Sequence, residues 1–508
     1  NGELIHSYPH SWRSKAPLVH RATPQWFISM ESHGLRKKAL KALDDTKFYP
    51  DKGRERIKAM IETRPDWCVS RQRVWGVPLP IFVHKTTKEI LVDDEVNENI
   101  ARIYEKEGSD CWFSDDPQRF LVDKYKAEDY DKINDIVEVW FDSGCTHAFV
   151  LEKRKDLQWP ASMYLEGSDQ HRGWFHSSLL ESCGTRGRAP YESILSHGFV
   201  VDGKGLKMSK SVGNVIAPED ILKKYGADIL RIWVSSSNYA EDLRIDYSIL
   251  EQHADSYRKI RNTFRYLLGN LNDDFNKIDL EKLDLNQLPE LEQYMLHRVY
   301  SLNENFKNYF KSYDFHNLYK ELLNFCTVDL SAFYFDIRKD ALYCDSKDSE
   351  RRKSSIVVLN VILESLIKWF APILSFTTEE IFTLINKEKK SIHLEKFIKF
   401  PKSFENEKLN KKWVELKKIR DICNISIEAK RATKDIGSSL EASLTIKLNN
   451  ELFEITENVD FSELCITSSV KIEKDNRNEI DIKTEKAKGL KCPVCWKINE
   501  GGCDRHPA

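Results

Sequence analysis

The chain carries the stretch HGFVVDGKGLKMSKS at residues 197–211, the most informative segment of the sequence. Gly205 and Gly213 bracket a loop whose residues 207–211 include two lysines and two serines. Such a loop can close over a triphosphate, because ammonium groups offset the charge of a departing pyrophosphate and glycines permit a close approach. A solvated basic turn is the alternative interpretation, and charge alone does not separate the two.

The sequence before and around this loop has a mixed character. Residues 1–247 are rich in Trp, Gly, Pro and His, and turn residues separate short apolar runs such as Ile81–Val83 and Ile136–Val139. This pattern predicts a mixed α/β fold with functional loops. A charged stretch near residues 85–135 has weaker apolar patterning, which favours an insertion.

After Asp246 the pattern becomes helical, because apolar residues recur at three- and four-residue spacing and so share one helical face. The first stripe consists of Leu250, Ala254, Tyr257, Ile260, Phe264 and Leu267. Similar stripes cover residues 291–310, 315–333 and 356–370. Pro372 ends the last of these, and Thr378 with the two glutamates after it predicts the start of another helix. We therefore expect a helical bundle.

The last hundred residues predict a smaller module. Residues 413–434 form one more amphipathic segment, which ends at Gly437, and residues 443–448 and 479–484 alternate like short strands. At the end, Cys492 and Cys495 form a C-x2-C pair, and Cys503 and His506 can complete C-x2-C-x7-C-x2-H. This spacing favours tetrahedral Zn²⁺ with a structural role.

Composition excludes several classes of protein. The 78 basic and 80 acidic residues of this 508-residue chain give a net charge of -2, so a polyanionic partner must be held by local patches. No apolar run approaches the roughly 20 residues needed to cross a bilayer. Most of the eleven cysteines are scattered, which fits a reducing, cytoplasmic location better than a disulfide framework.

The string Lys207-Met208-Ser209-Lys210-Ser211 is identical to the second signature of class I aminoacyl-tRNA synthetases, and the chain resembles that family over nearly its whole length. Residues 67–80, WCVSRQRVWGVPLP, are similar to an element of the isoleucine, valine and leucine enzymes. Residues 140–144 and 165–175 resemble the isoleucine enzymes, whereas the valine enzymes differ at both places. Residues 21–27 resemble the exit from the editing insertion of the isoleucine enzymes.

The resemblance implies a role for each candidate site residue. Residues 207–211 would bind ATP, with Lys207 and Lys210 as the catalytic cations. Residues that would bind the substrate and its adenylate are Glu166, Gly167, Asp169, Gln170, Trp140 and Trp174. A carboxylate such as Glu166 suits an ammonium group, and the tryptophans would wall a branched aliphatic side chain, although core packing is their alternative role. Asp169 and Gln170 would share a face with Glu166 if a helix begins there.

The resemblance also implies the organisation of the chain: a Rossmann-like α/β catalytic portion, an all-α anticodon-binding bundle and a small α/β zinc-binding module. The expected parts are an editing exit at 1–33, the C-terminal half of the catalytic domain at 34–246, a helical stem and anticodon domain at 247–440, a junction at 441–489 and a zinc segment at 490–508. The family's N-terminal HIGH-type sequence has no counterpart here, so we expect an inactive fragment of a longer enzyme. In the family, residues that follow the position of residue 508 usually complete the zinc site. The resemblance therefore supports Cys492 and Cys495 as zinc ligands.

The expected function of the full-length protein is isoleucine–tRNA ligation. Isoleucine would be activated with ATP and Mg²⁺ and then transferred to tRNA(Ile) by a cytoplasmic, monomeric enzyme without a membrane anchor. Discrimination against valine rests on one methylene, worth about 1–3 kcal/mol, for which isoleucyl-tRNA synthetase is the standard example. The alternatives are valine or leucine specificity, and a non-catalytic tRNA-binding or interaction protein derived from a synthetase. Near Gly437, Arg420, Lys430, Arg431 and Lys434 could contact tRNA or form a solvated face.

Overall fold

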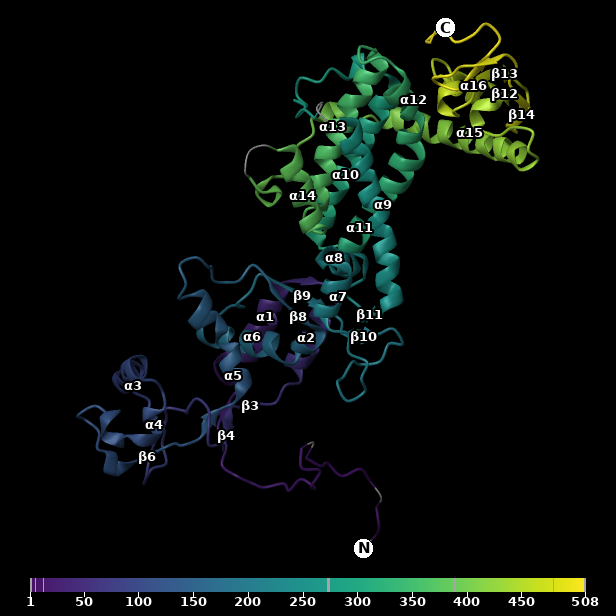
Figure 1. Ribbon diagram of the computed structural model, residues 1–508. Coiled ribbons are helices and arrows are strands. Elements are labelled where there is room, and N and C mark those ends of the chain that lie inside the picture. Colours follow the sequence, from purple (N-terminus) through teal and green to yellow (C-terminus); the bar gives the residue numbers. More distant parts are fainter. Residues whose placement is uncertain are drawn as a thin grey trace. The chain divides into compact units, whose positions relative to one another are not determined.

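The computed structural model describes residues 2–4, 6–11, 13–271, 275–386, 390–477 and 479–506 (Figure 1). The chain divides into two compact units, Asn1–Phe199 and Val200–Ala508. This division falls within the expected catalytic portion 34–246, and the boundaries of the expected parts stay a prediction. Pro507 and Ala508, at the end of the expected zinc segment, lie outside the described residues.

A parallel sheet with a crossover helix forms the centre of the first unit. Its strands lie in the order β2 (Lys47–Tyr49), β9 (Ser193–His197) and β8 (Tyr164–Gly167). Helix α6 (Trp174–Thr185) connects β8 to β9, and α1 (Leu35–Asp44) packs against it, while α2 (Lys52–Glu62) follows β2. Phe175, Leu179 and Ile194 lie in the buried core between them. Parallel strands need such a crossover, so the expected α/β architecture is confirmed.

The stretch that sequence patterning favoured as an insertion has a core of its own. Strand β5 (Phe82–His84) pairs antiparallel with β6 (Tyr130–Lys132), and α3 (Asp94–Glu107) and α4 (Cys111–Ser114) lie between them in the sequence. Phe82, Trp112 and Phe120 pack together in this core. The side chain of Asp93 accepts hydrogen bonds from the first turn of α3 and so caps its N-terminus.

The first unit also contains several short elements outside this sheet. Strand β1 (Phe27–Ile28) pairs with β3 (Trp67–Cys68), and β4 (Ser70–Arg71) pairs with β7 (Ile136–Val137). The apolar run Ile136–Val139 does not stay extended, because helix α5 (Val139–Gly144) begins within it. A π-helical segment, η4 (His147–Leu151), follows α5.

The second unit is built mainly of helices that pack around one core (Figure 1). It opens with a parallel pair, β10 (Val200–Asp202) and β11 (Leu243–Ile245), which α7 (Pro218–Tyr225) and α8 (Ala227–Ser236) connect. The bundle helices are α9 (Tyr247–Leu271), α10 (Glu290–Ser312), α11 (Phe315–Asn324), α12 (Asp336–Cys344), α13 (Glu350–Phe370), α14 (Ser375–Ile385) and α15 (Glu407–Ala432). The expected bundle is confirmed.

The stripe that predicted α9 is buried as expected, with Leu250, Ile260, Phe264 and Leu267 in the core. The stripe at 315–333 extends further than predicted, because the π-helical segment η8 (Phe325–Phe335) joins α11 to α12 without a break. The stripe at 356–370 lies in α13, which ends at Phe370, directly before the Ala371-Pro372 pair, as expected.

The predicted start of α14 at Thr378 is wrong. The helix begins at Ser375, because a carboxylate from elsewhere in the chain caps its first turn. Asp228 of α8 accepts hydrogen bonds from the backbone amides of Phe376 at 3.2 Å and Thr377 at 2.8 Å. Such a tertiary cap leaves no signal in the local sequence.

A small α/β module closes the second unit. Strand β12 (Ala442–Leu448) pairs in parallel with β13 (Ser469–Lys474) and antiparallel with β14 (Asp481–Lys486), and α16 (Asn450–Ile455) and α17 (Phe461–Leu464) lie between β12 and β13 in sequence. The hairpin β15 (Leu490–Lys491) and β16 (Ile498–Asn499) follows. The strand expected at 443–448 is confirmed, and the one at 479–484 is displaced by two residues.

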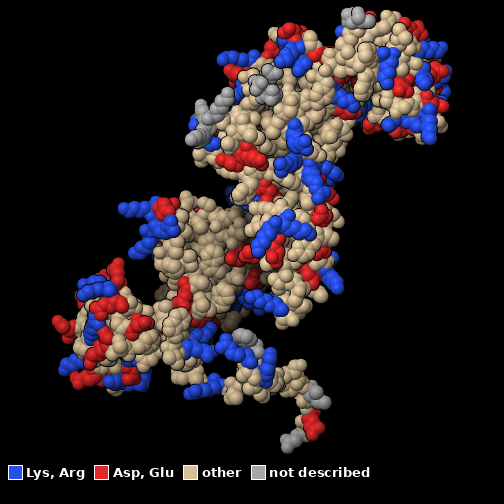
Figure 2. Space-filling model, viewed as in Figure 1, with Lys and Arg blue, Asp and Glu red and all other residues tan. Residues whose placement is uncertain are grey.

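The surface carries both signs of charge. On the face shown in Figure 2, basic and acidic side chains are intermingled, in keeping with the small net charge. Within the described ranges, no helix is long and apolar enough to span a bilayer.

Candidate functional site

The carboxyl end of β8 presents the first group of candidate residues. Glu166 is exposed at this strand end, and its carboxylate accepts a hydrogen bond from the amide of Gly167 at 3.1 Å. A Cβ at Gly167 would lie 2.7 Å from a carboxylate oxygen of Asp169, so the glycine makes room for that carboxylate. Ligands bind at the carboxyl ends of strands in open parallel sheets, which is where these residues lie.

Asp169 and Gln170 lie in a short 3-10 turn, η5 (Ser168–His171), between β8 and α6. The expectation that they share a helical face with Glu166 is wrong, because Glu166 belongs to the strand. Gln170 instead joins two elements: its amide donates to Asp169 at 3.1 Å, and its oxygen accepts from the backbone amide of Trp174 at 2.9 Å. It therefore satisfies one donor at the N-terminus of α6.

Trp140 approaches Gly173, the residue directly before Trp174. A Cβ at Gly173 would lie 2.8 Å from the Trp140 ring, so this glycine allows α5 to approach α6. Trp174 stacks on Tyr164 with 4.0 Å between the ring centroids, and its indole donates to the carbonyl of Ser143 at 3.0 Å. Trp140 is 42% exposed. The two tryptophans thus differ, since Trp174 is a packed wall and Trp140 presents apolar surface to solvent.

Glu138 is a residue that sequence reasoning missed. It is buried directly before α5, where its carboxylate accepts hydrogen bonds from the Trp67 indole at 3.0 Å and the Trp140 amide at 3.2 Å. Arg71 pairs with the same carboxylate at 3.5 Å. Glu138 therefore ties the segment 67–80 to the helix that carries Trp140. The available signal was an acidic residue two positions before a helical tryptophan, which is an N-cap pattern.

Two side chains, the acidic Asp202 and the uncharged Asn214, organise the lysine-rich loop of the second unit. Asp202 accepts from the amide of Leu206 at 2.8 Å and from the side chain of Asn214 at 2.9 Å, and these contacts lower the pKa of Asp202, the Asn214 bond most. The Asn214 oxygen accepts from the amide of Ser209 at 3.0 Å. Gly213 ends the turn with φ of 74°, which favours glycine.

Lys207 and Lys210 are exposed on this loop. Among the residues that the structure describes, neither ammonium group forms an ion pair, so both are available to an incoming anion. The hydroxyl groups of Ser209 and Ser211 lie 3.1 Å apart on the same turn. The loop can thus offer two cations and two hydroxyl groups to phosphate oxygens.

The four candidate zinc ligands come together near the β15–β16 hairpin. The ligand atoms of Cys492, Cys495, Cys503 and His506 all lie within 4.8 Å of one another. The Cys495 and Cys503 sulfurs are 3.7 Å apart, and His506 Nδ1 lies 3.6 Å from the Cys492 sulfur and 3.4 Å from that of Cys503. A tetrahedral Zn²⁺ with bonds of about 2.3 Å to sulfur requires ligand separations of about 3.8 Å. The donor set therefore fits zinc.

The surroundings prepare these groups for a metal. Backbone amides, that of Cys495 first, lower the pKa of Cys492 to about 6, which favours the thiolate. His506 Nε2 lies 2.9 Å from the carbonyl of Cys344, at the end of α12. A proton on Nε2 leaves the Nδ1 lone pair facing the sulfurs, the arrangement that outer hydrogen bonds commonly give a metal-binding histidine.

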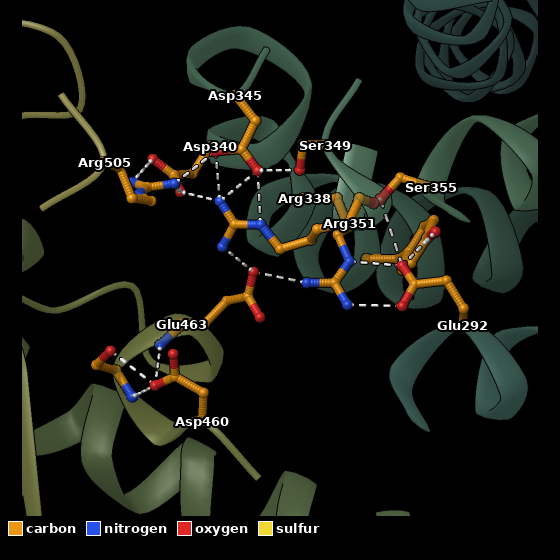
Figure 3. Close-up of polar contacts among 12 residues, drawn as sticks. Glu292, Arg338, Asp340, Asp345, Ser349, Arg351, Ser355, Asp460, Glu463 and Arg505 are labelled. Carbon is orange, nitrogen blue, oxygen red and sulfur yellow. Dashed lines mark hydrogen bonds and ion pairs between the residues drawn. The ribbon is translucent and has the colours of Figure 1, made fainter. Parts of the chain in front are cut away.

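Arg505 fastens the same segment to the bundle (Figure 3). Its guanidinium group pairs with Asp340, in the middle of α12, at 2.7 Å and with Asp345, directly after this helix, at 2.8 Å. Arg505 lies between the ligands Cys503 and His506. The zinc segment is therefore held at α12 by an ion pair as well as by the His506 contact.

The ion pairs continue inward from this point (Figure 3). Arg351 of α13 pairs with Asp340 and with Glu463 of α17, and Glu463 also pairs with Arg338 at 2.7 Å. Arg338 and Glu292 are both buried and form a two-pronged pair at 2.5 and 2.7 Å. A buried pair of this kind is costly to break on one side, so the network fixes the module on the bundle.

The basic residues near Gly437 are largely occupied. Arg420 is buried and donates to the carbonyl of Leu464 at 2.8 Å, which joins α15 to α17. Lys430 pairs with Asp435, and Arg431 pairs with Glu428. Arg420 is therefore a packing residue, and Lys430 and Arg431 form exposed ion pairs of the kind that the solvated-face interpretation predicts.

Two family descriptions match the chain. That of tRNA synthetases class I (I, L, M and V) matches residues 13–246, and that of the anticodon-binding domain of tRNA ligase matches residues 292–446. The first match includes the strand-end group and the lysine loop.

Relatives named isoleucine–tRNA ligase match over nearly the whole chain. The protein from Pelagibacter ubique is 89% identical over 506 residues, which cover 100% of this chain and 56% of the relative. The proteins from Brucella abortus and Zymomonas mobilis are 46% and 47% identical and cover 98% and 99% of this chain, and 52% and 55% of their own lengths. The chain spans about half the length of the curated relatives it matches.

Solved structures share the fold at low identity. Methionyl-tRNA synthetase of Mycobacterium tuberculosis, in complex with methionyl-adenylate, matches with a TM-score of 0.53 and 15% identity, over 75% of this chain and 67% of its own. A LeuRS–tRNA–LeuAMS complex from Agrobacterium radiobacter matches with a TM-score of 0.50 and 17% identity, over 69% and 45%. These likenesses concern the fold alone.

Proposed function

Because the chain belongs to the class I tRNA synthetases, we propose that the protein containing it is an isoleucine–tRNA ligase, which activates isoleucine with ATP and transfers it to tRNA(Ile). The observation that carries this proposal is 89% identity, over the whole chain, to a relative with that name. The domain boundaries expected from the sequence belong to the proposal. So do a cytoplasmic location and a monomeric state.

The first step joins isoleucine to the nucleotide. A carboxylate oxygen of isoleucine attacks the α-phosphorus of ATP, which is bound as its magnesium complex, and the bond to pyrophosphate breaks. Lys207 and Lys210 would stabilise the negative charge that grows on the leaving pyrophosphate, with Met208, Ser209 and Ser211 completing the loop. Their exposure, and the lack of ion pairs to them within the part of the chain that the structure describes, support this role. Catalysis of this kind is positioning plus charge stabilisation.

The strand-end group would hold the amino acid and the adenylate. The acceptor oxygens of Glu166 and Asp169 suit the ammonium and ribose hydroxyl groups, and Gly167 keeps the backbone close to the ligand. Gln170, which already joins Asp169 to Trp174, would complete the polar edge. The exposed face of Trp140 and the packed ring of Trp174 would enclose the aliphatic side chain.

The cysteine cluster would hold a structural Zn²⁺ through Cys492, Cys495, Cys503 and His506. The metal would cross-link the segment after β14 and contribute to its folding. Arg505 and the His506 contact with Cys344 then transmit that order to α12 of the bundle. The bundle would take the anticodon region of the tRNA, in line with the family description that covers residues 292–446.

Aminoacylation tests this proposal against a non-catalytic tRNA-binding protein. The chain is expressed with the further length that its relatives have, and charging of tRNA(Ile) and tRNA(Val) transcripts with isoleucine, valine and leucine is measured beside tRNA binding. We expect isoleucine to be attached to tRNA(Ile). Binding of tRNA(Ile) without any charging would favour the binding protein, and preferential charging with valine or leucine would reassign the specificity.

A further inference from the structure

A buried carboxyl group that the proposed reaction does not use lies behind the candidate amino-acid site. Glu181, in the third turn of α6, is 7% exposed. Neither of its carboxyl oxygens has a hydrogen-bond partner among the described residues, although the Cys145 thiol faces it. A buried, unpaired acid is expensive, so its place in the structure calls for a function.

The Glu181 carboxyl group supports the end of α5. A Cβ at Gly144, the last residue of α5, would overlap this carboxyl group, with the carboxyl carbon only 2.7 Å away. The carbonyl of Gly144 accepts from the Ser178 hydroxyl at 2.9 Å and lies 3.0 Å from His147 Nδ1. The end of α5 is thus hydrogen-bonded to α6 and rests on Glu181.

The space beside Glu181 is mainly apolar. A cavity of about 350 Å³ is lined by Ile28, Leu35, Trp67, Phe141 and Leu180 together with the Glu181 side chain. Burial in these surroundings, reinforced by the charges of Asp142 and Glu138, raises the pKa of Glu181 to about 8. The group is therefore neutral at pH 7 and packs without a counter-charge.

The other titratable groups around Glu181 do not neutralise it. The Cys145 thiol follows α5, and His147 of η4 has an unpartnered Nε2 and a pKa that burial lowers. Arg186, at the end of α6, pairs with Glu152 at 2.8 Å. The ionised form of Glu181 would consequently face the carbonyl end of α5 and two acidic residues with no cation committed to it.

We propose that Glu181 is a positioning residue that holds α5, and through it Trp140, in place for isoleucine binding. This inference rests on the proposed function. Glu138 fixes the start of α5 and Glu181 its end, so the ring of Trp140 is set by both contacts. Loss of the Glu181 proton places a negative charge against the carbonyl end of the helix, which is unfavourable, and loosens the wall of the pocket.

Kinetics as a function of pH test this inference. With the chain expressed at the length of its relatives, isoleucine-dependent exchange of pyrophosphate into ATP is measured from about pH 7 to about pH 9, and KM and kcat are separated. The wild type should show KM for isoleucine rising at least about threefold through pH 8, with kcat nearly constant. Glu181→Gln, which keeps the shape and cannot ionise, should show a flat KM. Glu192→Gln, an exposed control, should retain the rise.

Each outcome decides the matter. A flat KM in the wild type, or a rise that persists in Glu181→Gln, would overturn the positioning role, and the wild-type profile needs no variant to fold. If no isoleucine-dependent exchange occurs at any pH, the proposed function fails, and this inference fails with it.

Discussion

The lysine loop at 207–211 and the cysteine cluster at 492–506 are two polar sites of opposite design. The loop keeps Lys207 and Lys210 exposed and, among the described residues, without ion pairs, and Asp202 and neutral turn contacts shape it. The cluster brings four ligand atoms within 4.8 Å of one another and is fastened to α12. On the proposed function, the loop would meet a transient anion with uncommitted cations, whereas the cluster would meet a resident metal with ligands that are already assembled.

Lys210→Ala should have the largest effect of the variants of the lysine loop, on the rate of isoleucine-dependent exchange. Removal of one preorganised charge at the developing negative charge typically costs about 10²–10³ in rate, so isoleucine-dependent exchange should fall by that factor while isoleucine binding stays largely intact. The unfolding midpoint should not change, because the side chain is exposed. Lys204→Ala, an exposed lysine just outside the signature, serves as the control, and an equal loss there would refute a specific role.

Cys495→Ser should have the largest effect on the cluster side. The loss of one of four ligands should weaken zinc binding by more than about 100-fold, beyond the effect of an outer-shell change. Metal content after dialysis against a weak chelator measures this. Cys111→Ser, in the separate core of residues 82–130, should keep its metal. Full zinc content in Cys495→Ser would show that the cluster is not the site.

Arg505→Gln tests the attachment of the cysteine cluster to α12, because it leaves all four ligands in place. The loss of its pairs with Asp340 and Asp345 should lower zinc affinity by about tenfold and raise hydrogen exchange at the end of α12. Arg477→Gln, whose exposed pair with Asp475 lies away from the cluster, is the matched control. Unaltered exchange at α12 would separate the cluster from the bundle.

Asn214→Ala should have the smallest effect, on the shape of the loop. It removes the contact to the Ser209 amide, worth about 1 kcal/mol, and the contact to Asp202, so exchange should fall by about fivefold to tenfold and the free energy of unfolding should fall by about 1 kcal/mol or more. Asn308→Ala, at an exposed position on α10, is the control. A loss as great as that of Lys210→Ala would mean that loop geometry outweighs its charge.

The helices whose apolar residues recur at regular spacing were predictable from the sequence. The stripe from Leu250 to Leu267 predicted α9 because periodic apolar residues must share a buried face. The start of α14 was not, because Asp228, from a distant helix, supplies the cap. The spacing of the four metal ligands likewise predicted that they lie together, because a hairpin within a short segment is enough to assemble them.

The supporting residues of the first unit were hard to identify from the sequence, because the local signal was an N-cap pattern at Glu138 and none at Glu181. Glu138 and Glu181 are single acidic residues in a chain rich in acid, and their importance comes from burial. Burial at Glu181 depends on the approach of Gly144 across the fold. A motif identifies groups that touch a ligand, whereas the supports of those groups are set by tertiary packing.

Isoleucine-dependent exchange of pyrophosphate into ATP tests the central claim most directly. The chain, expressed at the length of its relatives, is assayed with isoleucine, valine and leucine in parallel, beside the Lys210→Ala variant. An isoleucine–tRNA ligase should show strong exchange with isoleucine, weaker exchange with valine and severe loss of exchange in the variant. Absence of exchange with all three amino acids, in a folded protein that contains the whole catalytic domain, would contradict it.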